Sequence, residues 1–213
     1  MASRPVPSPQ DALLVIDVQR DFCGGGSLEV PEAEAIVPVI NGLAKHFPCV
    51  VFTQDWHPAN HLSFASQHPG KAPFDTGALA TGEQILWPDH CVQGTPGAEF
   101  HADLDTAPAQ LVIRKGFRRE IDSYSAFYEN DRSTATGLTA YLRARGVIRV
   151  FLCGLATDVC VRHSALDACN ARFETVQIED ASRAIDQDGS LAAALEDMRA
   201  AGVKRMTAAG LGT

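Results

Sequence analysis

The segment from Asp55 to His61 carries three side chains suited to binding a metal ion. Asp55 and His57 would share one face of an extended segment, because side chains alternate along a strand. Pro58 suits the first position of a helical turn, which would place His57 and His61 on one side. A carboxylate with imidazoles and no thiolate suits a divalent transition metal. The spacing therefore predicts a metal site, with ordinary surface-loop histidines as the alternative.

Three residues elsewhere in the chain suit nucleophilic chemistry. Asp17 and Lys115 end two apolar runs, and Cys160 follows a third through a short turn into a helix. If these runs are parallel strands, the three side chains meet at one edge of a sheet. A helix N-terminus and a nearby lysine lower a thiol pKa, and a carboxylate can take the thiol proton and return it to a leaving amine. The trio predicts a cysteine hydrolase; the alternatives are a turn cap at Asp17, a surface Lys115 and an inert, buried Cys160.

Alternating strands and helices must position these side chains. The helical periodicity covers Glu32–His46, Gly137–Arg145, Asp158–Ala171 and Ser190–Ala200. Between them lie runs rich in Val, Ile, Leu and Phe, as expected for parallel strands covered on both faces: Ala12–Val18, Cys49–Gln54, Gln110–Lys115, Val147–Gly154, Thr175–Glu179 and Arg205–Ala208. This alternation predicts an α/β fold with a doubly wound, mostly parallel six-stranded sheet flanked by helices.

The length of 213 residues suits one domain, expected over residues 11–213 after a polar, proline-rich tail at 1–10. Residues 55–108 are rich in Pro, Gly, His and Asp and lack periodicity. A long irregular excursion inside a compact domain is usually functional. We therefore expect this segment to be an insert that builds the metal and substrate site.

Charge and cysteine usage bound the partners and the compartment. The formal net charge is −8 and no basic cluster stands out, which argues against nucleic acid and anionic membranes as partners. Residues 1–10 are too polar and proline-rich to be expected as a signal peptide, and no apolar run approaches the roughly 20 residues that span a bilayer. Six cysteines show no disulfide pattern, and Cys49 and Cys153 lie inside apolar runs. A reducing cytoplasm is the expected location.

Six segments together resemble nicotinamidases of the isochorismatase-like superfamily, in the order that the family has them. They are Ile16–Cys23, Thr53–Pro58, Trp87–Thr95, Arg114–Gly116, Asp122–Phe127 and Gly154–Val161. The resemblance covers the chain from about Ala12 to its end and implies the isochorismatase-like fold. It also implies an activity, the hydrolysis of nicotinamide to nicotinate and ammonia in NAD salvage, with pyrazinamide as a second substrate.

The resemblance assigns a role to each residue of the trio. Cys160 is similar in position to the nucleophile, Asp17 to the general base and acid, and Lys115 to the residue that holds both. The family's cis peptide would fall between Leu155 and Ala156, and the N–H groups of Ala156 and Cys160 would face the oxyanion. These roles agree with the chemistry expected from the residue types alone.

The resemblance also extends the metal site and adds residues that bind the substrate. It implies one divalent metal ion, with zinc favoured over iron or manganese, held by Asp55, His57, His61 and His90. Water or the pyridine nitrogen of the substrate would take the remaining positions. The residues similar to those that enclose the ring are Phe22, Trp87 and Tyr124. Relatives often self-associate, which leaves a homo-oligomer open here.

Three other functions stay open on the sequence. A cysteine hydrolase of the same superfamily could act on ureido or carbamoyl substrates, although such relatives generally lack the histidine cluster. A metallohydrolase could use metal-bound hydroxide, with Cys160 incidental. A binding module without catalysis has no need for the convergence of Asp17, Lys115 and Cys160.

Overall fold

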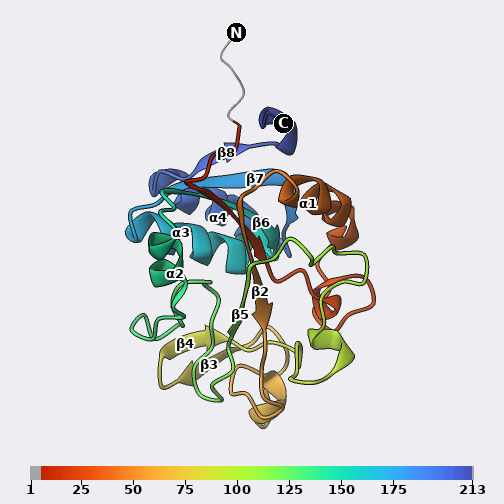
Figure 1. Ribbon diagram of the computed structural model, residues 1–213. Coiled ribbons are helices and arrows are strands. Elements are labelled where there is room, and N and C mark those ends of the chain that lie inside the picture. The colour runs from red at the N-terminus through yellow and green to blue at the C-terminus, as the bar shows by residue number, and fades with distance from the viewer. Residues whose placement is uncertain (1–5, 213) are drawn as a thin grey trace.

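Six parallel strands form one sheet in the computed structural model, which describes residues 6–212, in the order β5-β2-β1-β6-β7-β8 (Figure 1). Their bounds are β1 Asp11–Ile16, β2 Cys49–Asp55, β5 Leu111–Lys115, β6 Arg149–Leu155, β7 Glu174–Arg183 and β8 Lys204–Met206. All six predicted strands are confirmed. The largest difference is β7, which continues to Arg183 instead of ending at Glu179.

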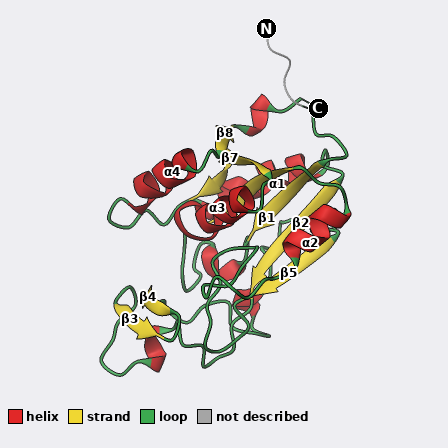
Figure 2. Cartoon of the chain, turned by 90° about the vertical axis from the view of Figure 1, so that its left-hand side faces the viewer, coloured by secondary structure: helices red, strands yellow, loops and turns green. Residues whose placement is uncertain are grey.

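Helices cover both faces of the sheet (Figures 1 and 2). One face packs against α1, and the other packs against α2, α3 and α4. The helices are α1 Val37–Ala44, α2 Leu138–Ala144, α3 Arg162–Asn170 and α4 Ser190–Ala200. The doubly wound α/β fold is therefore confirmed. The first helix is shorter than predicted, because Glu32 is left-handed (φ 57°) and Ala33–Ile36 form a 3-10 turn.

The central strands are buried on both sides, which explains their unbroken apolar sequences. In β1, Leu13 and Val15 face the α1 layer, whereas Leu14 and Ile16 face the layer of α2, α3 and α4. The outer strands are less covered: Val112 of β5 is 42% exposed. A near-continuous buried apolar run is therefore found in the central strands β1, β2 and β6, which position Asp17, Asp55 and Cys160, and not in β5.

The order of the strands reverses beside β1. From β1 the chain proceeds outward to β2 and β5, and it then crosses back to β6, β7 and β8 on the other side of β1. Such a switch point leaves a crevice at the carboxyl ends of the strands. Asp17 follows β1, Asp55 and Lys115 end β2 and β5, and Cys160 follows β6.

The insert of residues 55–108 contains a hairpin that the sequence did not predict. Strands β3 (Thr76–Leu79) and β4 (Gly82–Ile85) pair antiparallel and lie beyond the carboxyl end of the main sheet (Figures 1 and 2). The expected helical turn after Pro58 is wrong. Residues 58–61 form a turn closed by the His61 N–H donating to the Pro58 carbonyl at 3.0 Å.

The structure bears on the expectations for the cysteines, for membrane spans and for the N-terminal tail. All six cysteines are free thiols. In the described part of the chain no helix is both long and apolar enough to cross a membrane. Of the predicted tail at 1–10, residues 1–5 lie outside the described residues, and the domain boundaries stay a prediction.

Candidate active site

The structure brings Asp17, Lys115 and Cys160 together below the surface. The Lys115 ammonium lies 2.8 Å from Asp17 Oδ2 and 3.5 Å from Cys160 Sγ. It also donates to the Ser123 carbonyl at 2.8 Å. Asp17 and Lys115 are fully buried and Cys160 is 6% exposed. The three residues that sequence reasoning grouped from separate strand ends therefore form one contact cluster.

The same lysine also joins this cluster to the predicted metal site. Strand β2 lies between β1 and β5, and its last residue, Asp55, pairs in register with Lys115. To reach Asp17, the Lys115 side chain crosses the end of β2, and its ammonium lies 2.5 Å from Asp55 Oδ1. One buried cation thus holds two carboxylates, one from each half of the site.

Asp17 is fixed by Thr53 of β2. The Thr53 hydroxyl donates to Asp17 Oδ1 at 2.6 Å and accepts from the Asp17 N–H at 3.1 Å. Burial raises the pKa of Asp17 to about 6, against the attraction of Lys115. A carboxyl group with a pKa near neutrality can both accept a proton and return it during one reaction cycle.

Cys160 lies in a π-helical turn, Thr157–Val161, that joins β6 to α3. The peptide bond between Leu155 and Ala156 is cis, as the resemblance implied. Burial raises the pKa of the Cys160 thiol, while the Lys115 charge acts in the opposite direction. The thiol therefore needs a base to take its proton. Asp17 contacts the same Lys115 ammonium as the thiol and is placed to act as that base.

Asp55, His57 and His90 point three ligand atoms at one place. The Nδ1 atoms of His57 and His90 each lie 2.8 Å from a backbone carbonyl, of Gly116 and Pro88 respectively. A carbonyl only accepts, so Nδ1 carries the proton and Nε2 is free to bind a metal when the imidazole is neutral. The two Nε2 atoms lie 3.7 and 3.9 Å from Asp55 Oδ2.

These residues fit a divalent metal ion. The free carboxylate oxygen and the two imidazole nitrogens lie within 4.8 Å of one another and all three side chains are buried. One carboxylate with two histidines, each oriented by a backbone carbonyl, is the donor set of catalytic metal sites that keep positions open.

The fourth predicted ligand, His61, lies on another side of His57, with ring centroids 4.4 Å apart. Its Nδ1 accepts from the Ser63 N–H at 3.2 Å, and its Nε2 faces the Ile121 carbonyl at 3.4 Å. His61 groups with His57 and Asp122 rather than with Asp55 and His90. Its role as a ligand stays a prediction.

Gly116, beside the metal ligand His57, occupies a position that a side chain would disturb in two ways. Its φ is +65°, and a Cβ there would lie 2.4 Å from His57 Cε1. Gly116→Ala should displace the His57 ring and weaken metal binding by about 10–100-fold, as loss of a ligand-orienting contact does. Metal retained after dialysis against a chelator measures this. The exposed Gly70→Ala, also at positive φ with nothing near its Cβ, is the control, and equal retention in both variants would contradict the assignment.

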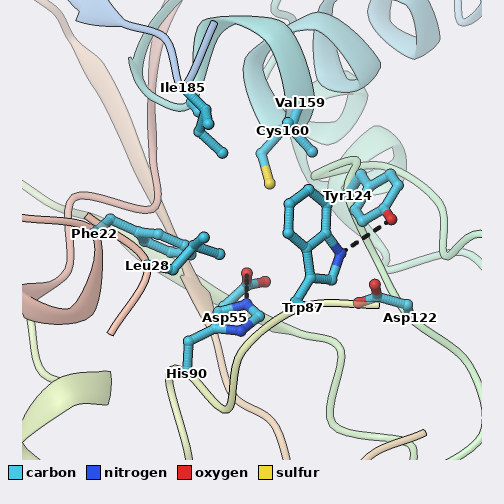
Figure 3. Close-up of a pocket in the computed structure, with 11 residues that line it drawn as sticks. Phe22, Leu28, Asp55, Trp87, His90, Asp122, Tyr124, Val159, Cys160 and Ile185 are labelled. Atoms are coloured by element: carbon cyan, nitrogen blue, oxygen red, sulfur yellow. Dashed lines mark hydrogen bonds and ion pairs between the residues drawn. The ribbon is translucent and has the colours of Figure 1, made fainter. Parts of the chain in front are cut away.

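A small cavity links the thiol to the metal ligands (Figure 3). Cys160 lies at one end, and Asp55 and His90 lie at the other. Its remaining walls include the predicted ring-binding residues Phe22, Trp87 and Tyr124, together with Leu28, Asp122, Ala156, Val159 and Ile185. The Trp87 Nε1–H donates to the Tyr124 hydroxyl at 3.2 Å, which sets the orientation of both rings.

Sequence reasoning missed three residues of this site: Thr53, Gly116 and Asp122. Thr53 and Gly116 lie next to predicted site residues, but only the sheet register shows what they contact. Asp122 is 3% exposed and lines the cavity. An acidic residue beside the otherwise apolar and hydroxyl-bearing segment 123–127 was the available signal.

The chain is similar to known proteins over most of its length. The chain is 55% identical over 196 residues to a nicotinamidase of Acinetobacter baylyi, covering 92% of each chain. It superposes with a TM-score of 0.93 on the nicotinamidase pyrazinamidase of Acinetobacter baumanii, at 54% identity over 95% of this chain and 98% of that one. It superposes on the pyrazinamidase of Pyrococcus horikoshii in complex with zinc with a TM-score of 0.76, at 38% identity over 93% and 99% of the chains. The isochorismatase domain matches residues 11–210, and the chain therefore belongs to the isochorismatase family.

Proposed function

We propose that this protein is a nicotinamidase, which hydrolyses nicotinamide to nicotinate and ammonia through a thioester on Cys160. The observation that carries the proposal is the cavity with a thiol at one end and a metal-ligand cluster at the other, walled by aromatic rings. The nicotinamidase names of the similar proteins support it. Pyrazinamide, a ring carboxamide of the same shape, is a second substrate, and the activity serves NAD salvage.

The cavity orients the ring. Phe22 and Trp87 lie on opposite walls of the cavity (Figure 3), where they would enclose an aromatic substrate between them. The carboxamide then faces Cys160, and the ring nitrogen faces Asp55, His57 and His90. The metal ion, when bound there, supplies a Lewis acid for that nitrogen. The end of the cavity remote from the thiol therefore determines which ring the enzyme accepts and how that ring is oriented.

The reaction divides into two acyl transfers. Asp17 takes the Cys160 proton as the sulfur attacks the amide carbon, and it returns this proton to the departing ammonia. Water, deprotonated by Asp17, then hydrolyses the thioester and releases nicotinate and the free thiol. Lys115 stabilises the negative charge on Asp17 and on the sulfur. We assign the oxyanion to the N–H groups of Ala156 and Cys160, where loss of one donor typically costs about 2.7–4 kcal/mol.

Zinc is the proposed metal. Two imidazoles and one carboxylate suit zinc, and also iron and manganese. The similar pyrazinamidase of Pyrococcus horikoshii was solved in complex with zinc. Elemental analysis of the purified protein tests the identity of the ion, and a cytoplasmic location and self-association stay proposals for separate measurement.

Comparison of nicotinamide with benzamide, which lacks only the ring nitrogen, tests the function. We expect kcat/KM for benzamide to be at least about 100-fold lower, since a site built around a polar group rejects an analogue without it. In His57→Ala, the value for nicotinamide should fall toward that for benzamide, so that the two substrates become nearly equivalent. Ammonia release measures both.

The same assay also tests the competing functions. Ureido and carbamoyl compounds as the preferred substrates would assign the chain to another activity of the superfamily. Unchanged discrimination against benzamide in His57→Ala would remove the metal from ring recognition. The exposed His46→Ala is the matched histidine control.

A further inference from the structure

Asp122 is a buried carboxylate beside the metal ligands that the proposed mechanism does not use. It is 3% exposed and lines the cavity (Figure 3). Its Oδ1 accepts from the Ser123 N–H at 2.8 Å, and its Oδ2 accepts from Gln84 Nε2 at 2.6 Å. A carboxylate oxygen of Asp122 also lies within 4.8 Å of nitrogens of His57 and His61.

The hydrogen-bond donors to Asp122 are uncharged. Lys115, the buried cation of this site, contacts the other two carboxylates, Asp17 and Asp55. The hydrogen bonds from an amide and a backbone N–H bring no positive charge to this carboxylate, and a negative charge buried without a cation nearby is costly. This charge faces the imidazoles that would hold a metal ion.

The buried charged groups of the site have a net charge that one divalent cation would neutralise. Three carboxylates, those of Asp17, Asp55 and Asp122, and one ammonium, that of Lys115, are each at most 4% exposed. If all three carboxylates are ionised, the histidines neutral and Cys160 protonated, these groups carry two net negative charges. One divalent ion neutralises both. Without Asp122, the same ion and Lys115 would together exceed the remaining carboxylates by one charge.

We propose that Asp122 is a positioning residue of the metal site, which supplies the second negative charge that the ion requires. Its carboxylate lies beside His57 and His61, where it would interact electrostatically with an ion held by the neighbouring ligands. Outer partners of this kind strengthen metal binding and orient what the ion holds. This inference rests on the proposed function in one respect, because it requires that the site binds a metal ion. It does not depend on which amide the enzyme hydrolyses.

Gln84 makes the hairpin part of this arrangement. It lies on β4, is buried, and donates to Asp122 Oδ2, while its own Oε1 faces Asn130 Nδ2 at 3.5 Å. The next residue toward the N-terminus, Glu83, is exposed on the other face of the strand. The hairpin of the insert therefore holds the Asp122 carboxylate in place, which explains a polar, buried residue in a short surface strand.

Metal affinity tests the proposal without any substrate. Zinc binding is measured by competition with a chromophoric chelator in wild type, Asp122→Asn and Asp122→Glu. We expect Asp122→Asn to weaken binding by about 10–100-fold and Asp122→Glu, which keeps the charge, to weaken it less. Glu83→Gln, which removes the same charge one residue from Gln84 on an exposed face, should match wild type. Wild-type affinity in Asp122→Asn would overturn the proposal, whatever the nicotinamide assay shows.

Thermal unfolding separates this role from a merely structural one. Metal-free Asp122→Asn should melt no lower than metal-free wild type, because the substitution removes an uncompensated buried charge. The rise in Tm on adding zinc should be smaller in the variant, because its affinity is lower. Equal losses of Tm with and without zinc would overturn the proposal. Should Asp122→Asn not fold, Gln84→Ala serves instead, with a several-fold loss of zinc affinity expected and an unchanged affinity counting against the assignment.

Discussion

Cys160→Ala should lose nicotinamide hydrolysis by at least about 10⁴-fold, since removal of the nucleophile of a covalent hydrolase removes most of its rate enhancement. The sulfur is the atom of the cavity placed to attack, with the Lys115 ammonium 3.5 Å away. Metal content should stay at the wild-type level, because His57 and His90 keep the backbone carbonyls that orient them and Asp55 keeps its contact with Lys115. Ammonia release and elemental analysis of the same preparation measure the two quantities.

A second thiol provides the control for this variant. Cys169 lies on α3 and is half-buried away from the cavity. Cys169→Ala should keep the wild-type rate. Turnover by Cys160→Ala within about tenfold of wild type, with metal bound, would assign the chemistry to metal-bound hydroxide instead.

Lys115→Met should have the largest effect on stability and should also abolish turnover. The ammonium is fully buried and contacts both Asp17 and Asp55, so its loss removes the cation that these two carboxylates share and leaves Asp17 without one. Breaking a buried ion pair by removing one partner typically costs about 3–5 kcal/mol, which corresponds to a fall in Tm of roughly 6–20 °C for a domain of this size. Without the cation, the sulfur and Asp17 also lose the charge that stabilises their anionic forms.

Thermal unfolding of the metal-loaded protein measures this loss. The exposed Lys71→Met is the matched control, because it removes the same charge from a side chain in solvent. It should melt within about 1–2 °C of wild type. A Lys115→Met variant as stable as that control would show that the lysine is not the buried link between the two halves of the site.

The fold was predictable because its central strands are covered on both faces. Apolar runs such as that of β1 are expected as buried strands of an α/β domain, and their predicted positions were right to within a few residues. The hairpin β3–β4 was not predictable. Its strands of four residues contain Gly77 and Gly82 and are mostly exposed, so neither alternation nor length distinguishes them from loop.

The catalytic trio could be proposed from strand ends, and Asp55 and His57 could be proposed as metal ligands from their spacing. His90, which converges with them, was implied only by the family resemblance. The contact between Asp55 and Lys115 could not be proposed, because it depends on β2 lying between β1 and β5. The charge at Asp122 was missed for a similar reason, since its partner Gln84 belongs to the unpredicted hairpin. The Pro58 turn shows the limit of local rules, because His57 and His61 approach each other there without a helix.

Sulfur attack at the carbon next to a metal-held ring is the central claim, and an aldehyde tests it most directly. Nicotinaldehyde labelled with ¹³C at the aldehyde carbon is added to wild type and to metal-replete Cys160→Ala, and the bound carbon is observed by NMR. We predict a tetrahedral carbon bonded to sulfur in wild type and none in the variant. A hydrate in wild type, or the same tetrahedral signal in both proteins, would contradict the account.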